Sequence, residues 1–405
     1  MKKNIIIISG IYPSNGILSL INYFSYSLIS NKDFKKRYNL KILIFNENNI
    51  LKTKKLIFNI YVNLKNVFSN QKKRIYSNAY SAKQFIQDNP HLRKNIVLYS
   101  NENDLINLNP QLIFPIYFPI KKNYINSIGY IYDFQHRDLP NFFTKHEINS
   151  RNKLFSDILN SNNCVLVNSS FVKKKLKKYF NSYNCKVIKI PFLPYIQNDL
   201  NKKKFKNLKK KYGIKKDFFI ICNHFWKHKN HNIAFEAFKQ FSKFNPDYQL
   251  ICTGDLVDSR HPEYFKSLSI KYKKIIDEKK ILILGVIPKD EQICLLKNTN
   301  AVIQPTSYEG GPGGFSAYEA ISYKKKLLIS DIPVNREIKD RNVFFFKNNS
   351  SRNLLKKLII INNRKLREVN KKKIFNSSNI NKEKLGFFLL NLIDKMIKIK
   401  SIKLK

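Results

Sequence analysis

The sequence predicts an α/β protein with two domains in series, each built on a parallel sheet. Short runs of Ile, Val and Leu alternate with longer segments of helical periodicity, as expected for strands buried on both faces. The alternation stops at Pro191 and Pro194, where a Lys- and Asn-rich stretch that we interpret as a linker extends to Lys211, and then it starts again. With 405 residues and an apolar fraction of 43%, the chain can form two packed cores.

The first domain, residues 1–195, is predicted to contain seven strands, mostly separated by segments long enough for crossover helices. The first apolar run, Ile5 to Ile8, resembles a signal peptide. It is too short, however, and it leads into Pro13 and Gly16 without a cleavage site, so we predict a buried strand. The predicted strands are Asn4–Ser9, Leu40–Phe45, Asn95–Tyr99, Leu112–Ile116, Ile128–Tyr132, Cys164–Asn168 and Lys186–Ile190.

The second domain, residues 196–380, repeats the pattern with six predicted strands and helices at His231–Phe244 and Lys289–Lys297. Residues 381–405 have an apolar helical face, so we expect a basic C-terminal helix that packs back on the body. The six strands are Asp217–Asn223, Tyr248–Thr253, Ile281–Gly285, Ala301–Gln304, Lys326–Ser330 and Val343–Phe346.

The chain is strongly basic, with 75 Lys+Arg against 28 Asp+Glu and a formal net charge of +47. Either an AT-rich coding bias or an attraction to anionic lipid or substrate explains this charge. Specific nucleic-acid binding is not expected, because the Lys residues are spread out and no nucleic-acid module is recognisable. No uninterrupted apolar run approaches the length of about 18 residues that a membrane helix requires. The five cysteines contain no C-x-x-C pair, which favours reduced, buried thiols in the cytoplasm.

The most informative motif follows the predicted strand Ala301–Gln304. Glu309 precedes a Gly-rich turn, Gly310 to Gly314; a helix is expected to begin near Ser316, and Glu319 lies one turn into it. Glycines allow a ligand to approach the backbone, and a helix N-terminus presents N–H groups to an anion. The motif thus combines a phosphate site with two carboxylates. The alternative is a capping box formed by Ser316 and Glu319.

A second motif, "NHFWKHKNH", follows the predicted strand Asp217–Asn223 and holds His224, Lys227 and Lys229 at the start of a helix. Cations in this position suit a diphosphate. A metal site formed by His224, His228 and His231 is one alternative, although the interleaved lysines would repel a dication. A solvated basic turn without function is the other.

In the first domain, His136 follows the predicted strand Ile128–Tyr132 and is a candidate for contacting a sugar or an acceptor. Its alternative role is packing against Phe142 and Phe143. Gly16, ahead of the first helix, is a candidate for a Gly-rich phosphate loop.

The two motifs of the second domain together resemble the signature of family 4 retaining glycosyltransferases with the GT-B fold. That family has a Glu, a Gly-rich turn with Pro and a second Glu eight positions on, where this chain has ten; "KKLLISDIPVNREI" resembles the strand that follows. The resemblance covers most of the second domain and, more weakly, the first. It implies two Rossmann-like domains facing each other across a cleft.

The resemblance also implies roles for individual residues. Glu319 would hold the ribose of the nucleotide, Glu309 the donor sugar and Lys229 the diphosphate, and His136 would touch the transferred sugar. His224 stands where the family has an Arg, and Lys227 is an alternative cation. The catalytic candidates are therefore Glu309, Lys229 and His136. The donor-binding candidates are Glu319, Gly311, Gly313, Gly314, Phe315, Lys227, His224 and Gly16.

The implied reaction moves a sugar from a nucleotide diphosphate sugar to a hydroxyl acceptor, with retention. No metal and no other cofactor are expected, because cations would neutralise the leaving group and no Asp-x-Asp motif occurs. Family analogy suggests bacterial surface polysaccharide or lipopolysaccharide synthesis on a lipid-linked glycan. The basic stretch Ser170 to Phe180 would then contact the anionic inner face of the membrane.

Other functional classes stay open at this stage. A non-catalytic basic protein on the same fold, binding a polyanion or a sugar, is the alternative. A phosphorylase or sugar epimerase is the nearest enzymatic rival. Kinases and P-loop NTPases are not expected, since no G-x-x-x-x-G-K-[ST] occurs.

Overall fold

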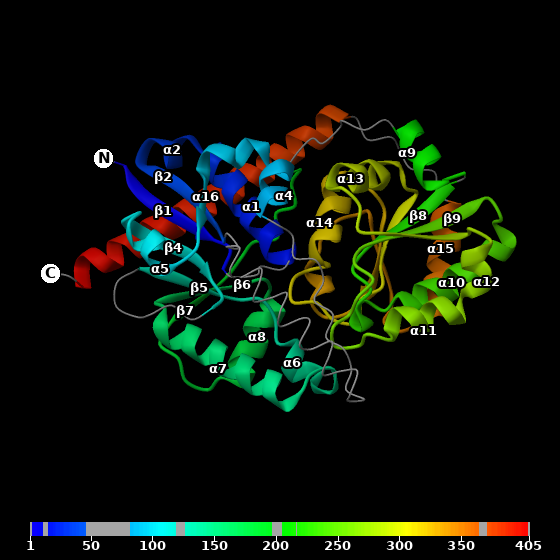
Figure 1. Ribbon diagram of the computed structural model, residues 1–405, viewed down its shortest axis with the longest axis horizontal. Coiled ribbons are helices and arrows are strands. Elements are labelled where there is room, and N and C mark those ends of the chain that lie inside the picture. The colour runs from blue at the N-terminus through cyan, green and yellow to red at the C-terminus, as the bar shows by residue number, and fades with distance from the viewer. Residues whose placement is uncertain are drawn as a thin grey trace. The chain divides into compact units, whose positions relative to one another are not determined.

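The computed structural model describes residues 2–10, 15–45, 82–118, 126–196, 205–215, 217–363 and 371–403. The chain forms two compact units (Figure 1). Unit 1 consists of Met1–Leu193 together with Ile380–Lys405, and unit 2 of Pro194–Asn379.

Unit 1 contains a seven-stranded, fully parallel sheet in the order β3-β2-β1-β4-β5-β6-β7. Each predicted strand is confirmed to within two residues. The runs of Ile and Val form strands because both faces of the sheet are covered; Ile5, Ile6 and Ile7 are fully buried. The strands are β1 (Lys3–Ile8), β2 (Tyr38–Phe45), β3 (Ile96–Tyr99), β4 (Pro110–Ile116), β5 (Ser127–Ile131), β6 (Cys164–Val167) and β7 (Lys186–Lys189).

Helices cover this sheet, and side-chain caps set the start of several of them. Thr144 and Glu147 form a reciprocal capping box at the start of α7, and Ser169 caps α8 by accepting from the Val172 amide. Before its final segment, the described part of unit 1 contains the helices α1 (Asn15–Ser30), α2 (Lys32–Arg37), α4 (Ala82–Asp88), η1 (Pro90–Asn95), α5 (Glu102–Ile106), α6 (Gln135–Asp138), η2 (Pro140–Phe142), α7 (Lys145–Ser161) and α8 (Ser170–Tyr179).

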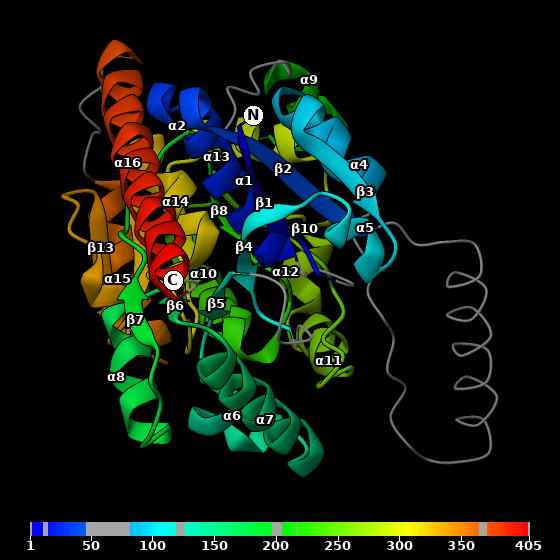
Figure 2. The ribbon, with the colours of Figure 1, turned by 90° about the vertical axis from the view of Figure 1, so that its left-hand side faces the viewer.

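The last helix, α16 (Lys371–Lys403), packs on unit 1 from Ile380 onward, beside α1 and α2 (Figure 2). Asp394 accepts two hydrogen bonds from the Arg37 guanidinium, at 3.1 and 3.0 Å, and one from the Tyr38 hydroxyl at 2.7 Å. The apolar face of α16 is buried through Leu385, Leu389, Leu390, Leu392, Ile393 and Met396. The predicted C-terminal helix is confirmed, and it begins ten residues earlier than expected.

Unit 2 contains a six-stranded, fully parallel sheet in the order β10-β9-β8-β11-β12-β13. Each of the six predicted strands is again confirmed to within one residue. The strands are β8 (Asp217–Cys222), β9 (Tyr248–Thr253), β10 (Ile281–Gly285), β11 (Ala301–Gln304), β12 (Leu327–Asp331) and β13 (Val343–Lys347).

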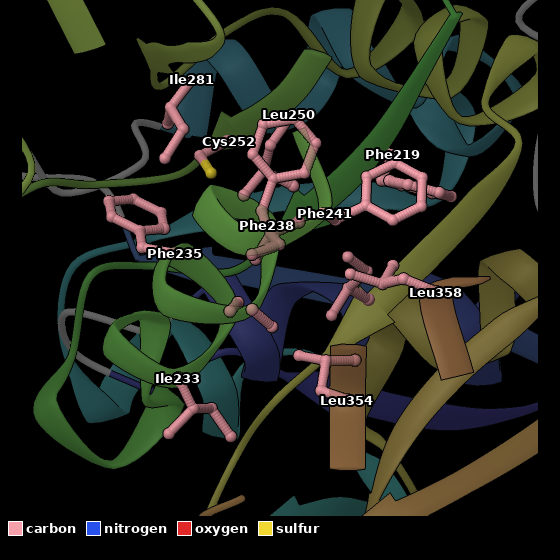
Figure 3. Packing of buried hydrophobic residues seen from close by; sticks show 14 of the residues in the cluster. Phe219, Ile233, Phe235, Phe238, Phe241, Leu250, Cys252, Ile281, Leu354 and Leu358 are labelled. Atoms are coloured by element: carbon pink, nitrogen blue, oxygen red, sulfur yellow. The ribbon is translucent and has the colours of Figure 1, made fainter. Parts of the chain in front are cut away.

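Helices lie on both faces of this sheet, with α13 and α14 on one side and α10 and α15 on the other (Figure 1). On the α10 side, Phe219, Leu250 and Cys252 of the sheet pack against Phe235 and Phe238 of α10, all fully buried (Figure 3). The helices are α9 (Phe205–Tyr212), η3 (Lys227–Lys229), α10 (His231–Phe244), α11 (Tyr264–Lys271), α12 (Lys273–Asp277), α13 (Lys289–Asn298), α14 (Gly314–Ser322), η4 (Asn335–Glu337) and α15 (Ser351–Asn362).

One expectation about this unit is wrong. The Lys-rich stretch that we interpreted as linker up to Lys211 forms helix α9 at its end. Leu208 is buried there, and Lys211 pairs with Glu291 of α13 at 2.7 Å. The packing of one apolar side chain and an ion pair order a segment whose composition alone indicates a loop.

Two lysines of unit 2 stabilise helix ends. Lys325 Nζ donates to the Lys297 carbonyl at 3.0 Å, and Lys326 Nζ donates to the Ile361 carbonyl at 2.9 Å. These carbonyls belong to the last turns of α13 and α15, where the helix dipole favours a cation. Part of the high Lys content thus supports the fold.

The five cysteines are free thiols, and all but the partly buried Cys222 are buried. No helix in the described ranges is both long enough and apolar enough to cross a membrane.

Candidate donor site in unit 2

The two sequence motifs of unit 2 lie at neighbouring positions in the fold. Strands β8 and β11 pair in the sheet, and the motifs follow their carboxyl ends. In open α/β sheets ligands bind at this edge. Lys229 of the first motif and Glu309 of the second meet here: Lys229 Nζ lies 2.5 Å from Glu309 Oε1, and the two side chains are 13% and 12% exposed.

The Gly-rich turn has a backbone that requires glycine. Gly313 and Gly314 have φ angles of +66° and +63°. A Cβ atom on Gly313 would lie 2.4 Å from the Cβ of Ala317, so a side chain does not fit there. The Gly313 amide donates to Asn335 Oδ1 at 2.8 Å, so this N–H is already used. Helix α14 begins directly after it.

The alternative capping box at this helix is not formed. Helix α14 begins at Gly314 rather than at Ser316, and its N-cap, Gly313, makes no side-chain cap. Ser316 is buried inside the first turn. The consecutive glycines move the start of the helix two residues earlier, and the N-cap Gly313 has no side chain that could accept from the first N–H groups of α14.

Glu319 lies on α14 beside a second cation. It forms an ion pair with Lys289, at the start of α13, and its side chain is 19% exposed. Lys289 also donates to Gln292 Oε1 at 2.8 Å, and Gln292 donates to the Thr253 hydroxyl at 2.9 Å. Lys289 was not among the residues that the sequence identified. Its position after strand β10, at the same edge of the sheet, was the available signal.

The remaining members of the two motifs have varied positions. Lys227 is exposed, and its backbone N–H donates to Asp258 Oδ2 at 2.9 Å. Gly311 and Phe315 are half-buried within the turn and the first turn of α14. His224 Nδ1 accepts from the Asp255 amide at 2.9 Å, so its proton lies on Nε2. Burial lowers the pKa of His224, which favours the neutral ring and leaves an Nε2–H donor rather than a cation.

Comparison with known proteins finds a family similar to this unit. Residues 203–380 match the family model "Glycosyl transferases group 1". Most of unit 2 is therefore similar to group 1 glycosyl transferases. No curated protein sequence matches the chain.

Solved structures similar to the whole chain include several glycosyltransferases. The glycosyltransferase from Rickettsia africae ESF-5 is 14% identical with a TM-score of 0.58, covering 98% of this chain and 99% of that one. Anabaena Alr3699/HepE in complex with UDP-glucose is 14% identical with a TM-score of 0.56, and WaaG, a glycosyltransferase involved in lipopolysaccharide biosynthesis, is 10% identical with a TM-score of 0.55. Both comparisons cover 98% of this chain and 99% of the other. These similarities confirm the GT-B fold.

The alternative metal site in unit 2 is not formed. His231 stacks on Phe225 at 4.0 Å between ring centroids, inside the core, whereas His224 stacks on Trp226 at 5.2 Å. Across the described ranges, no three or more His, Cys, Asp or Glu side chains are placed to hold a metal ion.

The buried His231 makes the stability of unit 2 depend on pH. Burial lowers the pKa of His231 to about 3, whereas an unfolded His has a pKa of about 6.5. Below pH 6.5 the unfolded chain binds a proton that the folded domain does not. We therefore expect the free energy of unfolding to fall by at most about 1.4 kcal/mol per pH unit from this ring.

Urea unfolding at pH 7 and pH 4.5 measures this dependence. The variant His231→Phe keeps an aromatic ring against Phe225 and should show a smaller loss of stability on acidification. An equal loss in the variant and the wild type would contradict the assignment.

The two remaining candidates from the sequence, His136 and Gly16, lie in unit 1. His136 is fully buried in α6, where its Nε2–H donates to Asn152 Oδ1 at 3.1 Å and its ring packs against Phe155 and Phe143. Burial lowers its pKa to about 4, so the ring is neutral at pH 7. Gly16 is exposed in the first turn of α1.

Proposed function

We propose that this protein transfers a sugar from a nucleoside diphosphate sugar to a hydroxyl acceptor, with retention at the anomeric carbon. One observation carries the proposal: a Lys229–Glu309 ion pair beside a Gly313–Gly314 turn that opens helix α14. The neighbour Alr3699/HepE was solved in complex with UDP-glucose, which supports a UDP-sugar as donor. This chain and Alr3699/HepE share only 14% sequence identity, so the proposed activity rests on the geometry of the site rather than on the similarity of the folds.

The site suits a reaction in which negative charge grows on a departing diphosphate. When the bond from the anomeric carbon to oxygen breaks, the Lys229 ammonium and the first N–H groups of α14 stabilise the new charge. In this proposal Lys229 and these amides neutralise the leaving group without a metal ion. Glu309 contacts the donor sugar and Glu319 the ribose hydroxyls.

The acceptor is proposed to be a lipid-linked glycan of bacterial surface polysaccharide or lipopolysaccharide synthesis, at the inner face of the membrane. Similarity to WaaG supports the pathway. Helix α8 supports the location, because Lys174, Lys177 and Lys178 are exposed on it. Lys175 is not available, since its Nζ lies 2.5 Å from Asp138 Oδ1.

We expect the variant with Lys174, Lys177 and Lys178 changed to Gln to bind anionic liposomes about 100-fold more weakly, because each Lys near such a surface contributes about 1 kcal/mol. Sedimentation with phosphatidylglycerol vesicles measures the change. The control replaces three exposed lysines of α2, Lys32, Lys35 and Lys36, and should lose far less. Equal losses in the two variants would mean that general charge, not α8, binds the membrane.

A thermal-shift screen of the full chain against UDP, GDP, ADP and their sugars tests the proposed function. A true donor raises the melting temperature by mass action. The donor that binds is then used in an assay of nucleotide release, with Glu319→Ala expected to raise KM. If no nucleotide shifts the melting temperature, or if Glu319→Ala releases nucleotide as the wild type does, the proposal fails.

A further inference from the structure

A buried amide connects the two sides of the candidate donor site. Gln304 ends strand β11 and is 1% exposed. Its Nε2 donates to the Gly313 carbonyl at 2.6 Å and lies 3.5 Å from Glu309 Oε1. Its Oε1 accepts from Asn223 Nδ2, just beyond the end of β8. Both ends of the amide therefore have partners.

These partners allow only one orientation of the Gln304 amide. Turning it over would place its oxygen against the Gly313 carbonyl and the Glu309 carboxylate, and its NH₂ group against the NH₂ group of Asn223. In a buried site such contacts between like groups are costly. Gln304 thus holds Glu309, which in turn pairs with Lys229.

The same amide fixes the Gly-rich turn from one side while Asn335 fixes it from the other. The Gly313 carbonyl accepts from Gln304, and the Gly313 N–H donates to Asn335 Oδ1 at 2.8 Å. Asn335 is itself fully buried and donates to the Ser330 carbonyl at 2.9 Å. A carbonyl tied to Gln304 cannot turn toward an anionic ligand at the start of α14.

We propose that Gln304 is a positioning residue of the donor site, which holds the Glu309 carboxylate against Lys229 and keeps the Gly313 carbonyl away from the donor diphosphate. This inference rests on the proposed function. Gln304 itself is buried beneath the site and acts through Glu309 and Gly313.

In the variant Gln304→Glu, the positioning role should make UDP affinity depend on pH. The introduced carboxylate has no N–H to donate, and it faces the Glu309 carboxylate and the Gly313 carbonyl. Burial and the neighbouring charge disfavour its ionised form, so acid restores a proton that can again be donated. We expect the Kd for UDP to rise at least about tenfold at pH 8 and to return toward the wild-type value at pH 5.5.

Two further variants separate positioning from general destabilisation. Gln304→Met removes the three hydrogen bonds of the amide, to Gly313, Glu309 and Asn223, and should weaken UDP binding at every pH. Gln249→Glu is the matched control: Gln249 is also buried in the sheet, accepts from the Lys215 amide at 3.0 Å and donates to the Lys279 carbonyl at 2.9 Å, but lies near the amino end of β9. It should lose stability and keep its UDP affinity.

Calorimetric titration with UDP, together with kcat for nucleotide release from UDP-glucose, is carried out on all four proteins between pH 5.5 and 8.5. Should Gln304→Glu not fold, Gln304→Met decides. Wild-type UDP affinity in the Gln304 variants, or an equal loss in Gln249→Glu, overturns the positioning role alone. A wild type that binds no UDP and no other nucleotide overturns the proposed function and this inference with it.

Discussion

Replacing Lys229 with Met is expected to lower kcat/KM for sugar transfer by about 100- to 1,000-fold, the range found when one group that stabilises transition-state charge is removed. Lys229 is the cation that pairs with Glu309 beside the Gly-rich turn. Met retains much of the apolar length of the side chain. Steady-state nucleotide release, with KM and kcat separated, measures the effect.

The Lys229→Met variant also leaves a mostly buried Glu309 carboxylate without its partner, which costs stability. The double variant Lys229→Met/Glu309→Gln removes that charge and should regain stability but not activity. As a charge control, Lys271→Met removes a cation of unit 2 that hydrogen bonds Asn232 at the surface, and it should be fully active. Full activity in both Lys229 variants would refute the assigned role of this ammonium.

Ending the chain at Asn379 is expected to leave unit 1 unable to fold. The removed segment buries six large apolar side chains on unit 1, each contributing about 1.5–3 kcal/mol, so the loss is on the order of 10 kcal/mol. A domain has a total stability of about 5–15 kcal/mol. The Asp394 hydrogen bonds to Arg37 and Tyr38 are lost as well. Soluble yield and near-ultraviolet circular dichroism of the truncated chain measure the outcome.

A chain ending at Lys398 is the control, since it retains Asp394 and the buried residues up to Met396. It should fold and melt as the full chain does. A soluble, cooperatively folded unit 1 in the protein that ends at Asn379 would show that α16 merely lies on a surface that is stable without it.

The strands could be predicted from sequence because burial on both faces of a parallel sheet selects continuous apolar runs. Lys229 and Glu309 could be selected for a related reason: each follows such a run, and the carboxyl ends of neighbouring parallel strands meet at one edge. Lys229 and Glu309 are 80 residues apart in the sequence, so no local sequence pattern predicts their contact.

The supporting residues could not be predicted in this way. Gln304 depends on Asn223, 81 residues earlier, and Asn335 binds Gly313 across 22 residues. A Gln at the end of the apolar run "AVIQ" was a visible signal of a buried polar group, but its partners come from tertiary structure. The alternative capping box of Ser316 and Glu319 is not formed for a local reason: two glycines with positive φ start helix α14 before Ser316.

The net charge of +47 divides into several roles once the structure is known. Lys229 and Lys289 pair with the two carboxylates of the donor motif, and Lys325 and Lys326 stabilise helix ends. Composition alone indicates an anionic partner or a coding bias. The position of each lysine in the fold shows which of them pair with carboxylates or helix ends.

Calorimetric titration of the full chain with UDP and with uridine tests most directly whether unit 2 binds a diphosphate at Lys229. The wild type should bind UDP at least about tenfold more tightly than uridine, because only UDP reaches the ammonium and the start of α14. Lys229→Met should abolish most of that difference and leave uridine affinity unchanged. Equal affinities for UDP and uridine in the wild type, or an undiminished preference for UDP in the variant, would contradict the site.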